Sequence, residues 1–395
     1  MPGLTYHLKP RGLCRGAALT LVFASVLATA AATGSLPREV GADTDVETRA
    51  VSSTVGSVDR EEIADAVADA EADGESGTDA AEEVVSRSGD RWGAVYDERE
   101  YEEFEQALDG SYTGVGISAR RSARGEVTVS GVRAGGPAQR AGVRKGDLLR
   151  TVDGRPVEKR PVAEVVALLR GDRTKAAEGS SVVLGLSRGG HSWATTLRRA
   201  RLSTDPVSVR RLGQDPSAAV LIKVAAFTKG TGAAVRDAVD EAPGDAGILL
   251  DLRANAGGLV SEAVTASSAF LDGGLVATYD VHGEQHALYA EPGGDTGRPV
   301  VVLVDGGTMS AAELLTGALQ DRGRAVAVGT RTFGKGSVQL PSELPGGSVA
   351  ELTVGHYRTP AGRTVEGSGI TPDVRAGREA QQRGETVLSG LGGGS

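Results

Sequence analysis

The chain has 395 residues, with 43 basic and 52 acidic side chains and a net charge of -9. This length predicts two or three domains, and hydrophobic residues at 39% with charged residues at 24% are typical of folded globular proteins. The acidic balance and an aromatic content of only 4% argue against nucleic-acid binding. The single cysteine, Cys14, excludes intrachain disulfides and zinc sites built from several cysteines.

The amino terminus has the pattern of an export signal. Lys9, Arg11 and Arg15 precede an apolar run at 17–32, which ends in Ala-x-Ala sites. The run is shorter than the roughly 20 apolar residues of a membrane-spanning helix, which favours a cleaved signal peptide, and an uncleaved membrane anchor is the alternative. We therefore expect an extracytoplasmic protein, either secreted or anchored to the cell membrane by residues 1–32. A polar linker is expected at 33–56.

The acidic residues are concentrated in one part of the chain. Residues 41–110 contain 22 acidic and 5 basic side chains, and a solvated surface explains this excess better than a cation-binding role. Within an N-terminal helical region at 57–110, helices are expected at 61–73 and 100–110 because both have helix-forming composition. The side chains expected on their apolar faces are Ile63, Val67, Tyr101, Phe104 and Leu108.

The next region, residues 111–200, has the pattern of a small β-rich module. Strands separated by glycine turns are expected at 127–132, 147–154 and 182–190. A helix is expected at 161–171, between the second and third of these strands.

Residues 201–377 alternate between strand-like and helix-like segments. Apolar runs that end in glycine loops begin the segments 218–227, 247–271, 298–320 and 324–336. This alternation predicts an α/β domain, with chemistry at the carboxyl ends of its strands. The last residues, 378–395, end in GLGGGS, so we expect a flexible tail.

Ser310 is the first candidate catalytic residue because it lies where a buried strand ends and a helix begins. An ordinary N-cap is one interpretation, in which the hydroxyl accepts a backbone N–H of the first turn. A nucleophile is the other, because free N–H groups at a helix start can stabilise an oxyanion. A serine and histidine triad is weakly supported, since the chain has no GxSxG motif and no histidine in a recognisable catalytic setting.

Lys335 is the candidate base. It lies in the segment TFGKGSVQ directly after an apolar run, and an amine in an apolar pocket loses its charge preference and can accept a proton near neutral pH. Gln339, four residues later, can orient that amine without adding charge. The alternative is a surface lysine in a glycine turn.

Two other motifs are rejected. The segment 329–336 resembles a phosphate-binding loop, but Gly336 stands where that motif needs a serine or threonine. The segment from His282 to His286 is not HExxH and has no helix to place both rings on one face, so no metal site is predicted. Neither a nucleotide nor a metal cofactor is expected.

Several separated motifs together resemble the carboxyl-terminal processing peptidases, which are tail-specific serine proteases of family S41 with an embedded PDZ domain. The similarity extends over about 91–374. The matching segments are REYEEFEQALDG, GGPAQRAGVRKGDLLRTVDG, ILLDLRANAGGLV, MSAAELLTGALQDRGRAVAVGTRTFGKGSVQ and HYRTPAGRTVEGSGITPDV. The resemblance implies an α/β multidomain fold, with N-terminal helices to 110, a PDZ domain at 111–200 and a protease domain of the crotonase/ClpP-like class at 201–377.

The same resemblance assigns roles to individual residues. Ser310 falls on the nucleophile, Lys335 on the general base and Gln339 on the orienting residue. The oxyanion hole maps onto the backbone N–H groups of Ala311 and Gly258, with Gly257 a less certain neighbour, although the loop RANAGG lacks the proline and second asparagine of the family's RNNPGG. Asp321 matches an acidic position near the nucleophile, which we interpret as structural.

The resemblance also implies the partners of the chain. Its PDZ domain is expected to bind protein or peptide substrates by their free C-termini, which add to an exposed strand edge. The segment expected to hold the terminal carboxylate consists of Tyr112, Thr113, Gly114, Val115, Gly116 and Ile117. An exported PDZ scaffold that binds tails without cutting them is the alternative function.

Overall fold

The computed structural model describes residues 60–122, 125–158, 160–171, 178–213, 218–281 and 284–392. The expected signal or anchor, the linker and Cys14 therefore lie outside the described residues, as does His282. The chain divides into two compact units, each described by itself below. The described part of the first unit is Ser111–Thr204, and the second consists of the described residues up to Gly110 and from Asp205 onward.

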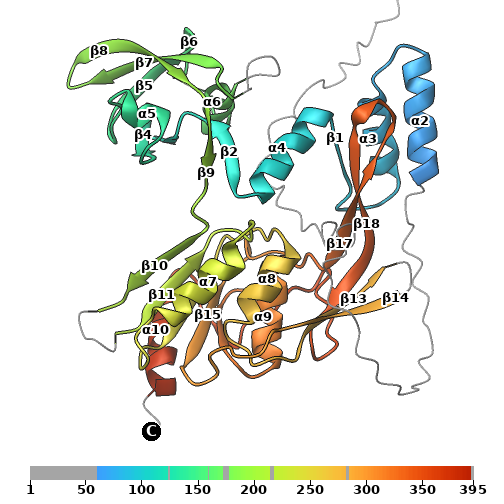
Figure 1. The fold of residues 1–395 in the computed structure, drawn as a ribbon, viewed down its shortest axis with the longest axis vertical. Helices are drawn as coiled ribbons and strands as arrows, with labels where there is room; N and C mark the ends of the chain where they lie inside the picture. The colour runs from blue at the N-terminus through green and yellow to red at the C-terminus, as the bar shows by residue number, and fades with distance from the viewer. Residues whose placement is uncertain are drawn as a thin grey trace, which may run out of the picture. The chain divides into compact units, whose positions relative to one another are not determined.

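The second unit contains a sheet of six strands in the order β10, β11, β12, β15, β16 and β19 (Figure 1). Strand β10 is antiparallel to β11, and the other neighbouring pairs are parallel. The strands are Val207–Arg211 (β10), Val220–Val224 (β11), Ile248–Asp251 (β12), Val300–Val304 (β15), Val326–Gly329 (β16) and Val374–Arg375 (β19). This sheet confirms the α/β prediction for the region after residue 201.

Helices cover both faces of this sheet, which explains why its strands are apolar without alternation. Three helices, Thr231–Asp240 (α7), Val260–Ser267 (α8) and Ala311–Asp321 (α9), follow strands β11, β12 and β15 in the chain. Ile222, Leu250 and Val302 join the same hydrophobic cluster as residues of these helices. Leu221, Leu249 and Leu303 point to the other face, where they pack with residues of Ala380–Gly392 (α10).

The expectation of a flexible tail was wrong for residues 380–392, which form α10. Ala380 and Leu388 are buried in the cluster beneath the sheet. A Cβ at Gly384 would come within 2.7 Å of Leu303 and 3.0 Å of Leu249, so the absence of a side chain allows close packing here. Tertiary burial therefore outweighs the poor helix propensity of glycine in this segment.

A second sheet in this unit has the order β1, β18, β13 and β14, with β17 also paired to β18. Its strands are Ala94–Tyr96 (β1), Leu275–Val281 (β13), Glu284–Tyr289 (β14), Ser337–Glu343 (β17) and Val349–Arg358 (β18), and the 3-10 helix Pro345–Gly347 (η2) joins β17 to β18. The N-terminal helices are Arg60–Ala72 (α2), Gly77–Arg87 (α3) and Glu98–Leu108 (α4). The first two share a hydrophobic cluster with β1, β18 and Leu344.

The helices expected at 61–73 and 100–110 are confirmed with shifts of one or two residues, whereas α3 was not anticipated. Ile63, Val67, Phe104 and Leu108 are buried, as their spacing predicted. The N-terminal helical region up to Gly110 belongs to the same compact unit as the α/β sheet.

The first unit is β-rich, in agreement with the sequence pattern. Its main sheet has the order β3, β4, β5, β7 and β8, with β6 paired to β5, and β2 pairs separately with β9. The strands are Ser111–Gly114 (β2), Ile117–Arg121 (β3), Val127–Val132 (β4), Leu148–Val152 (β5), Arg155–Pro156 (β6), Ser181–Arg188 (β7), His191–Arg198 (β8) and Ala200–Ser203 (β9). The helices are Pro137–Arg140 (α5) and Val162–Arg170 (α6).

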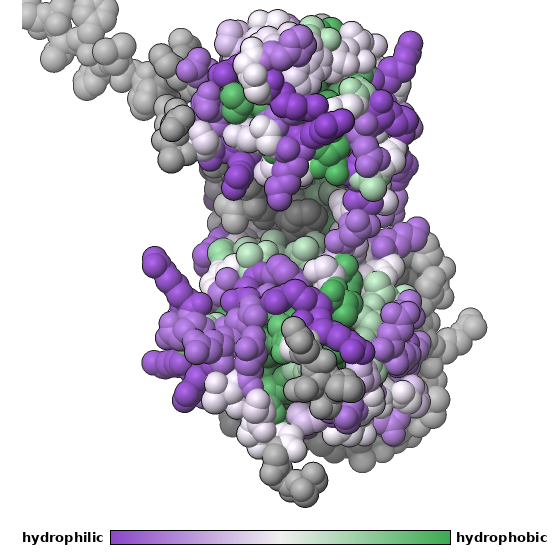
Figure 2. Space-filling view, turned by 90° about the vertical axis from the view of Figure 1, so that its left-hand side faces the viewer, coloured by the Kyte–Doolittle hydropathy of each residue, from purple (hydrophilic) through white to green (hydrophobic). Residues whose placement is uncertain are grey.

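The visible surface is mainly hydrophilic. Figure 2 shows a face that is largely purple, with small separate green areas. Across the described parts of the chain, the large hydrophobic side chains that are exposed are Val183, Val209, Tyr289, Phe333 and Leu391. Among these described residues, no helix has the length and apolar character needed to cross a membrane.

Arg199 provides a test of the packing in the first unit. This arginine is 1% exposed, and it donates hydrogen bonds to the carbonyl oxygens of Leu168, Leu169 and Ser181. Arg199→Met leaves these carbonyls without their donor and should lower the free energy of unfolding of this unit by about 2–3 kcal/mol. Trp193 fluorescence during urea denaturation, in a Trp92→Phe background, measures the effect.

The neighbouring Arg198→Met serves as the control because Arg198 is exposed, and it should change the free energy of unfolding by less than about 0.5 kcal/mol. Equal losses in the two variants would show that the internal hydrogen bonds of Arg199 do not stabilise the unit.

Candidate active site

Ser310 immediately precedes α9, at the carboxyl end of the central sheet. It is fully buried, and its φ of 54° with ψ of -118° is unusual for a residue with a side chain. Its hydroxyl oxygen has no hydrogen-bond partner among the described residues, while the side chain of Glu313 accepts the Ser310 amide at the start of the helix. Strained backbone and an unused buried hydroxyl are both features that concentrate at functional sites.

Glu313, one turn into α9, fastens the Ser310 segment to the Lys335 segment. One carboxylate oxygen accepts the amides of Ser310 and Lys335, each at 2.9 Å. The other accepts the Gly334 amide at 2.7 Å and the Thr332 hydroxyl at 2.5 Å. Burial raises the pKa of Glu313, and the hydrogen bonds from Thr332 and the three amides oppose that rise. Four donors around one carboxylate hold the two segments in a defined position.

Tyr357 on β18 makes a second link between the same segments. Its hydroxyl lies 3.0 Å from the carbonyl oxygen of Ser310 and 3.2 Å from that of Lys335, so its proton can be donated to either. The side chain is buried. The backbones on both sides of the site therefore have two independent attachments to each other.

The amine of Lys335 is enclosed and oriented. The residue is 3% exposed, and Nζ donates a hydrogen bond of 2.7 Å to Oε1 of Gln339. Burial lowers the pKa of Lys335 to about 8, against the opposing effect of the carboxylates of Glu351, Glu366 and Asp90. A neutral amine is thus accessible slightly above neutral pH, although in this structure it contacts Gln339 and makes no hydrogen bond to Ser310.

The glycine loop after β12 packs directly against Ser310. A Cβ at Gly257 would be 3.0 Å from Cβ of Ser310, which is tighter than an ordinary contact, and the φ of 95° is one that side chains rarely adopt, so this position favours glycine. The Gly257 amide donates to the side chain of Asn255 at 2.8 Å, whereas the amides of Gly258 and Ala311 donate no hydrogen bond within the described chain. Of the two glycines, Gly258 therefore has the free donor.

Asn255 holds this loop in place. Its side-chain NH2 group donates to the backbone carbonyl of Val224 at 3.0 Å. Its backbone carbonyl accepts the amide of Met309, the residue before Ser310. Asn255 is fully buried. The asparagine retained in RANAGG thus connects strand β11, the glycine loop and the segment that carries Ser310.

Glu351 on β18 is a buried carboxyl group close enough to influence Lys335. It is fully buried, and neither side-chain oxygen has a hydrogen-bond partner in the described structure. Burial raises the pKa of Glu351 to about 7, and the charge of Lys335 opposes this rise. A carboxyl group in such surroundings is neutral over much of the acidic range.

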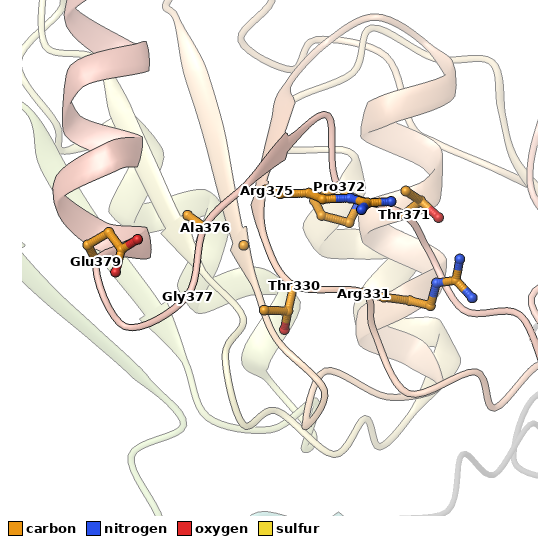
Figure 3. A pocket seen from close by; sticks show the side chains of 9 residues that line it. Thr330, Arg331, Thr371, Pro372, Arg375, Ala376, Gly377 and Glu379 are labelled. Atoms are coloured by element: carbon orange, nitrogen blue, oxygen red, sulfur yellow. The ribbon is translucent and has the colours of Figure 1, made fainter.

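Other candidate positions lie outside this cluster. Asp321, at the end of α9, accepts the amide of Ala361 at 2.9 Å and forms an ion pair with Arg363. The pocket in Figure 3 is lined by Thr330, Arg331, Thr371, Pro372, Arg375, Glu379 and three small residues. It contains none of the site residues expected from the sequence.

The segment expected to bind a terminal carboxylate lies in the first unit, between β2 and β3. The carbonyls of Val115 and Gly116 accept the amides of Ala138 and Arg133, whereas their own amides donate no hydrogen bond within the described residues. Strand β3 is at the edge of its sheet, and α6 packs against it. An edge strand beside a helix is an arrangement to which an extended peptide can add.

The structure brings Lys335 and Gln339 into contact and fastens Ser310 to the same cluster. Sequence reasoning missed the roles of Glu313, Tyr357, Asn255 and Glu351, all of which shape this site. Glu313 could have been noticed as an acidic residue on the otherwise apolar helix face after Ser310. Tyr357 and Glu351 carry no local signal, because their partners are distant in the sequence, whereas Asn255 lies in the RANAGG loop and accepts the amide of Gly257 two residues later.

Two parts of the chain match known protein families. Residues 219–376 match the model of peptidase family S41, and residues 128–178 match a PDZ domain model. The carboxy-terminal processing protease CtpA of Bacillus subtilis is 32% identical over 298 residues, which cover 74% of this chain and 62% of that protein. The chain is a member of the carboxyl-terminal processing peptidases of family S41.

Two further relatives carry related names. The chloroplastic carboxyl-terminal-processing peptidase 2 of Arabidopsis thaliana is 31% identical over 309 residues, covering 74% of this chain and 59% of that protein. A solved structure of a photosystem II D1 C-terminal processing protease is 30% identical, covers 80% of this chain and 86% of that one, and has a TM-score of 0.49. The chain spans about three-fifths of the length of these curated relatives.

Within this S41 chain, Glu351 predicts a specific dependence of stability on pH. Its pKa is about 7 in the folded chain and 4.5 ordinarily, so between these values the folded state holds a proton that the unfolded state has lost. This group therefore removes about 3 kcal/mol of stability as pH rises through that interval. In Glu351→Gln the fall in free energy of unfolding between pH 5 and 8, measured by urea denaturation, should be smaller by about this amount.

Glu343→Gln is the matched control, because Glu343 is an exposed glutamate of the paired strand β17. It should leave the pH dependence of the parent unchanged. If the free energy of unfolding of Glu351→Gln fell between pH 5 and 8 as much as that of the parent, a raised pKa for this carboxyl group would be contradicted. The lowered pKa of Lys335 does not interfere, because its contribution falls between pH 8 and 10.5.

Proposed function

We propose that this chain is an exported serine endopeptidase that cleaves protein substrates near their C-termini with a Ser310 and Lys335 dyad. The observation that carries the proposal is the enclosed amine of Lys335, oriented by Gln339 and fastened through Glu313 to the segment that bears an unused, buried serine hydroxyl. Membership of family S41 supports a peptidase. Export rests on the apolar run at 17–32.

The proposed reaction is acyl transfer. Neutral Lys335 accepts the proton of Ser310 while the serine oxygen bonds to the scissile carbonyl carbon, and the protonated lysine then gives a proton to the departing amine as the C–N bond breaks. Water attacks the resulting ester by the same route and releases the new carboxyl end. Lys335 must turn from Gln339 toward Ser310, a contact of the kind that often tightens only when substrate binds.

Backbone donors supply the charge stabilisation in this proposal. The amides of Gly258 and Ala311 are free within the described chain. Gly258 follows Gly257, which packs against Ser310, and Ala311 follows Ser310 itself. Ala311 is also the first residue of α9, where the helix dipole favours negative charge. An oxyanion on the substrate carbonyl would accept from both amides, as an oxyanion hole requires. The chemistry needs no metal or cofactor.

Substrate selection is assigned to the first unit. A substrate's last residues would add to β3 as a strand, with the terminal carboxylate accepting the amides of Val115 and Gly116. A peptide with an amidated C-terminus should therefore be cleaved at least about tenfold less efficiently than the same peptide with a free carboxylate, because a charge-assisted hydrogen-bond acceptor is lost. The ratio of kcat/KM values for the two peptides measures this preference.

The dyad makes a direct prediction for two substitutions. Ser310→Ala and Lys335→Ala should each lower kcat on an unstructured polypeptide by about 10³-fold or more, because each removes one partner of the proton transfer. Ser261→Ala and Lys229→Ala are the controls, since both residues are exposed and Lys229 also precedes a glycine. Mass spectrometry of the products follows cleavage, and equal activity in parent and variants would contradict the dyad.

The pH dependence should follow the protonation of Lys335. Because the base acts when neutral and its pKa is about 8, kcat should rise about tenfold per pH unit below that value and level off above it. A rate that is constant from pH 6 to 9 would contradict a lysine base. If the protein binds peptides with free C-termini but cleaves none of them at any pH, the alternative function, a PDZ scaffold that binds tails without cutting them, would be supported instead.

A further inference from the structure

Trp92 lies in the turn between α3 and β1, outside the residues that match the peptidase family model. It nevertheless contacts both Gln339 and Lys335, residues that lie more than 240 positions later in the chain. The sequence gives no signal for this contact. Two separate parts of Trp92, its backbone carbonyl and its indole ring, take part.

The carbonyl of Trp92 determines which end of the Gln339 amide faces the lysine. It accepts a hydrogen bond of 2.5 Å from Nε2 of Gln339. A carbonyl oxygen can only accept a hydrogen bond, so the Gln339 side chain turns its NH2 group toward Trp92. Its Oε1 then faces Lys335 and accepts the hydrogen bond from Nζ. If the Gln339 amide were reversed, its NH2 group would face the Lys335 amine, which is also a donor, and its oxygen would face the Trp92 carbonyl, which is also an acceptor.

The indole ring of Trp92 covers the lysine amine, with Nζ of Lys335 5.2 Å from the ring centroid. Its Nε1 donates to Oε1 of Glu366 at 2.9 Å, and Oε2 of Glu366 accepts the amide of Gly336 at 2.8 Å. One carboxylate thus connects the ring to the residue that follows Lys335. Phe333 packs on the ring from the same loop, at 5.6 Å between centroids.

Asp90 attaches the Trp92 turn to the strand opposite Gln339. Oδ1 accepts the amides of Trp92 and Gly93 at 3.0 and 2.9 Å. The same carboxylate accepts the amide and the hydroxyl of Thr353, both at 2.8 Å. Thr353 is the register partner of Gln339 in the β17 and β18 pair. The turn is therefore held directly beside the residue it orients.

We propose that Trp92 is a positioning residue for the catalytic pair, with its carbonyl setting the direction of Gln339 and its indole excluding water from the amine of Lys335. The N-terminal helical segment is thereby a structural part of the active site. The inference rests on the proposed function, because it assigns an effect on catalysis. The charged groups around the amine are Glu351 on β18, Glu366 in the following loop and Asp90, with Arg91 4.6 Å above the indole.

The test replaces the ring and follows Lys335 in two ways in the full chain. The first readout is the pH profile of kcat, and the second is the rate of Lys335 acetylation by acetic anhydride as a function of pH, measured by mass spectrometry without any substrate. In Trp92→Ala, water reaches the amine. Because burial is the largest effect on the pKa of Lys335, this outweighs the lost attraction of the ring for the charged amine, and both profiles should shift upward by about one pH unit or more. At pH 7, kcat should therefore fall about tenfold with KM little changed. The difference in kcat between parent and variant should become smaller at pH 10.

Matched variants separate positioning from stability. Trp92→Phe keeps an aromatic cover and the carbonyl and should stay within a few tenths of a pH unit of the parent. Val84→Ala removes buried volume from the same N-terminal segment, at a residue of the α2 and α3 cluster, so it should lower the melting temperature without shifting either profile. If Trp92→Ala does not fold, Trp92→Leu carries the test, with the same direction and a smaller shift.

The two hypotheses fail differently. Parental profiles in both Trp92→Ala and Trp92→Leu, in a preparation whose parent cleaves substrate, would overturn the role of the indole in excluding water from Lys335, because both variants keep the backbone carbonyl that orients Gln339. A parent that cleaves nothing would overturn the proposed function, and the acetylation profile would still decide whether Trp92 shields the amine. Equal upward shifts in Val84→Ala and Trp92→Ala would also overturn the proposal, because a general loosening would then explain both.

Discussion

The carboxylate of Glu313 is the interaction on which the site depends. It accepts amides from the segment that carries Ser310 and from the segment that carries Lys335, so two loops at the ends of neighbouring strands share one acceptor. Tyr357 joins the same two segments from the second sheet. Because every donor here is buried, separating the segments would leave several polar groups unsatisfied. Rigid attachment of this kind is what a proton transfer between fixed partners needs.

Burial and charge act in opposite directions on Lys335, and burial is the larger effect. Three carboxylates favour the protonated amine, yet its pKa is about 8 because little water reaches it. The same dry region keeps Glu351 largely neutral in acid. The enclosure comes partly from Trp92, so the N-terminal segment, β17, β18 and the α/β sheet all contribute to one electrostatic environment. This explains why the site is assembled from residues spread over most of the second unit.

The extent of prediction from sequence differed between local and distant features. The α/β alternation and the helices around Ile63 and Phe104 follow from periodicity, and the triplet Ser310, Lys335 and Gln339 followed from residue chemistry together with resemblance to a family. Contacts such as that of Trp92 with Gln339 could not be predicted, since nothing local to either residue specifies the other. The C-terminal helix was missed for a related reason: its glycines indicate flexibility, and only the hydrophobic surface of Leu249 and Leu303 makes helix formation favourable.

A crystal structure of the parent protein with a peptide boronic acid tests the Ser310 and Lys335 dyad, because boron forms a tetrahedral adduct with an active serine. We expect a bond from boron to the Ser310 oxygen, a boronate oxygen within about 3 Å of the amides of Gly258 and Ala311, and the Lys335 amine turned from Gln339 toward the serine. An adduct on another residue, or a Lys335 amine that remains away from the bonded Ser310, would contradict the dyad.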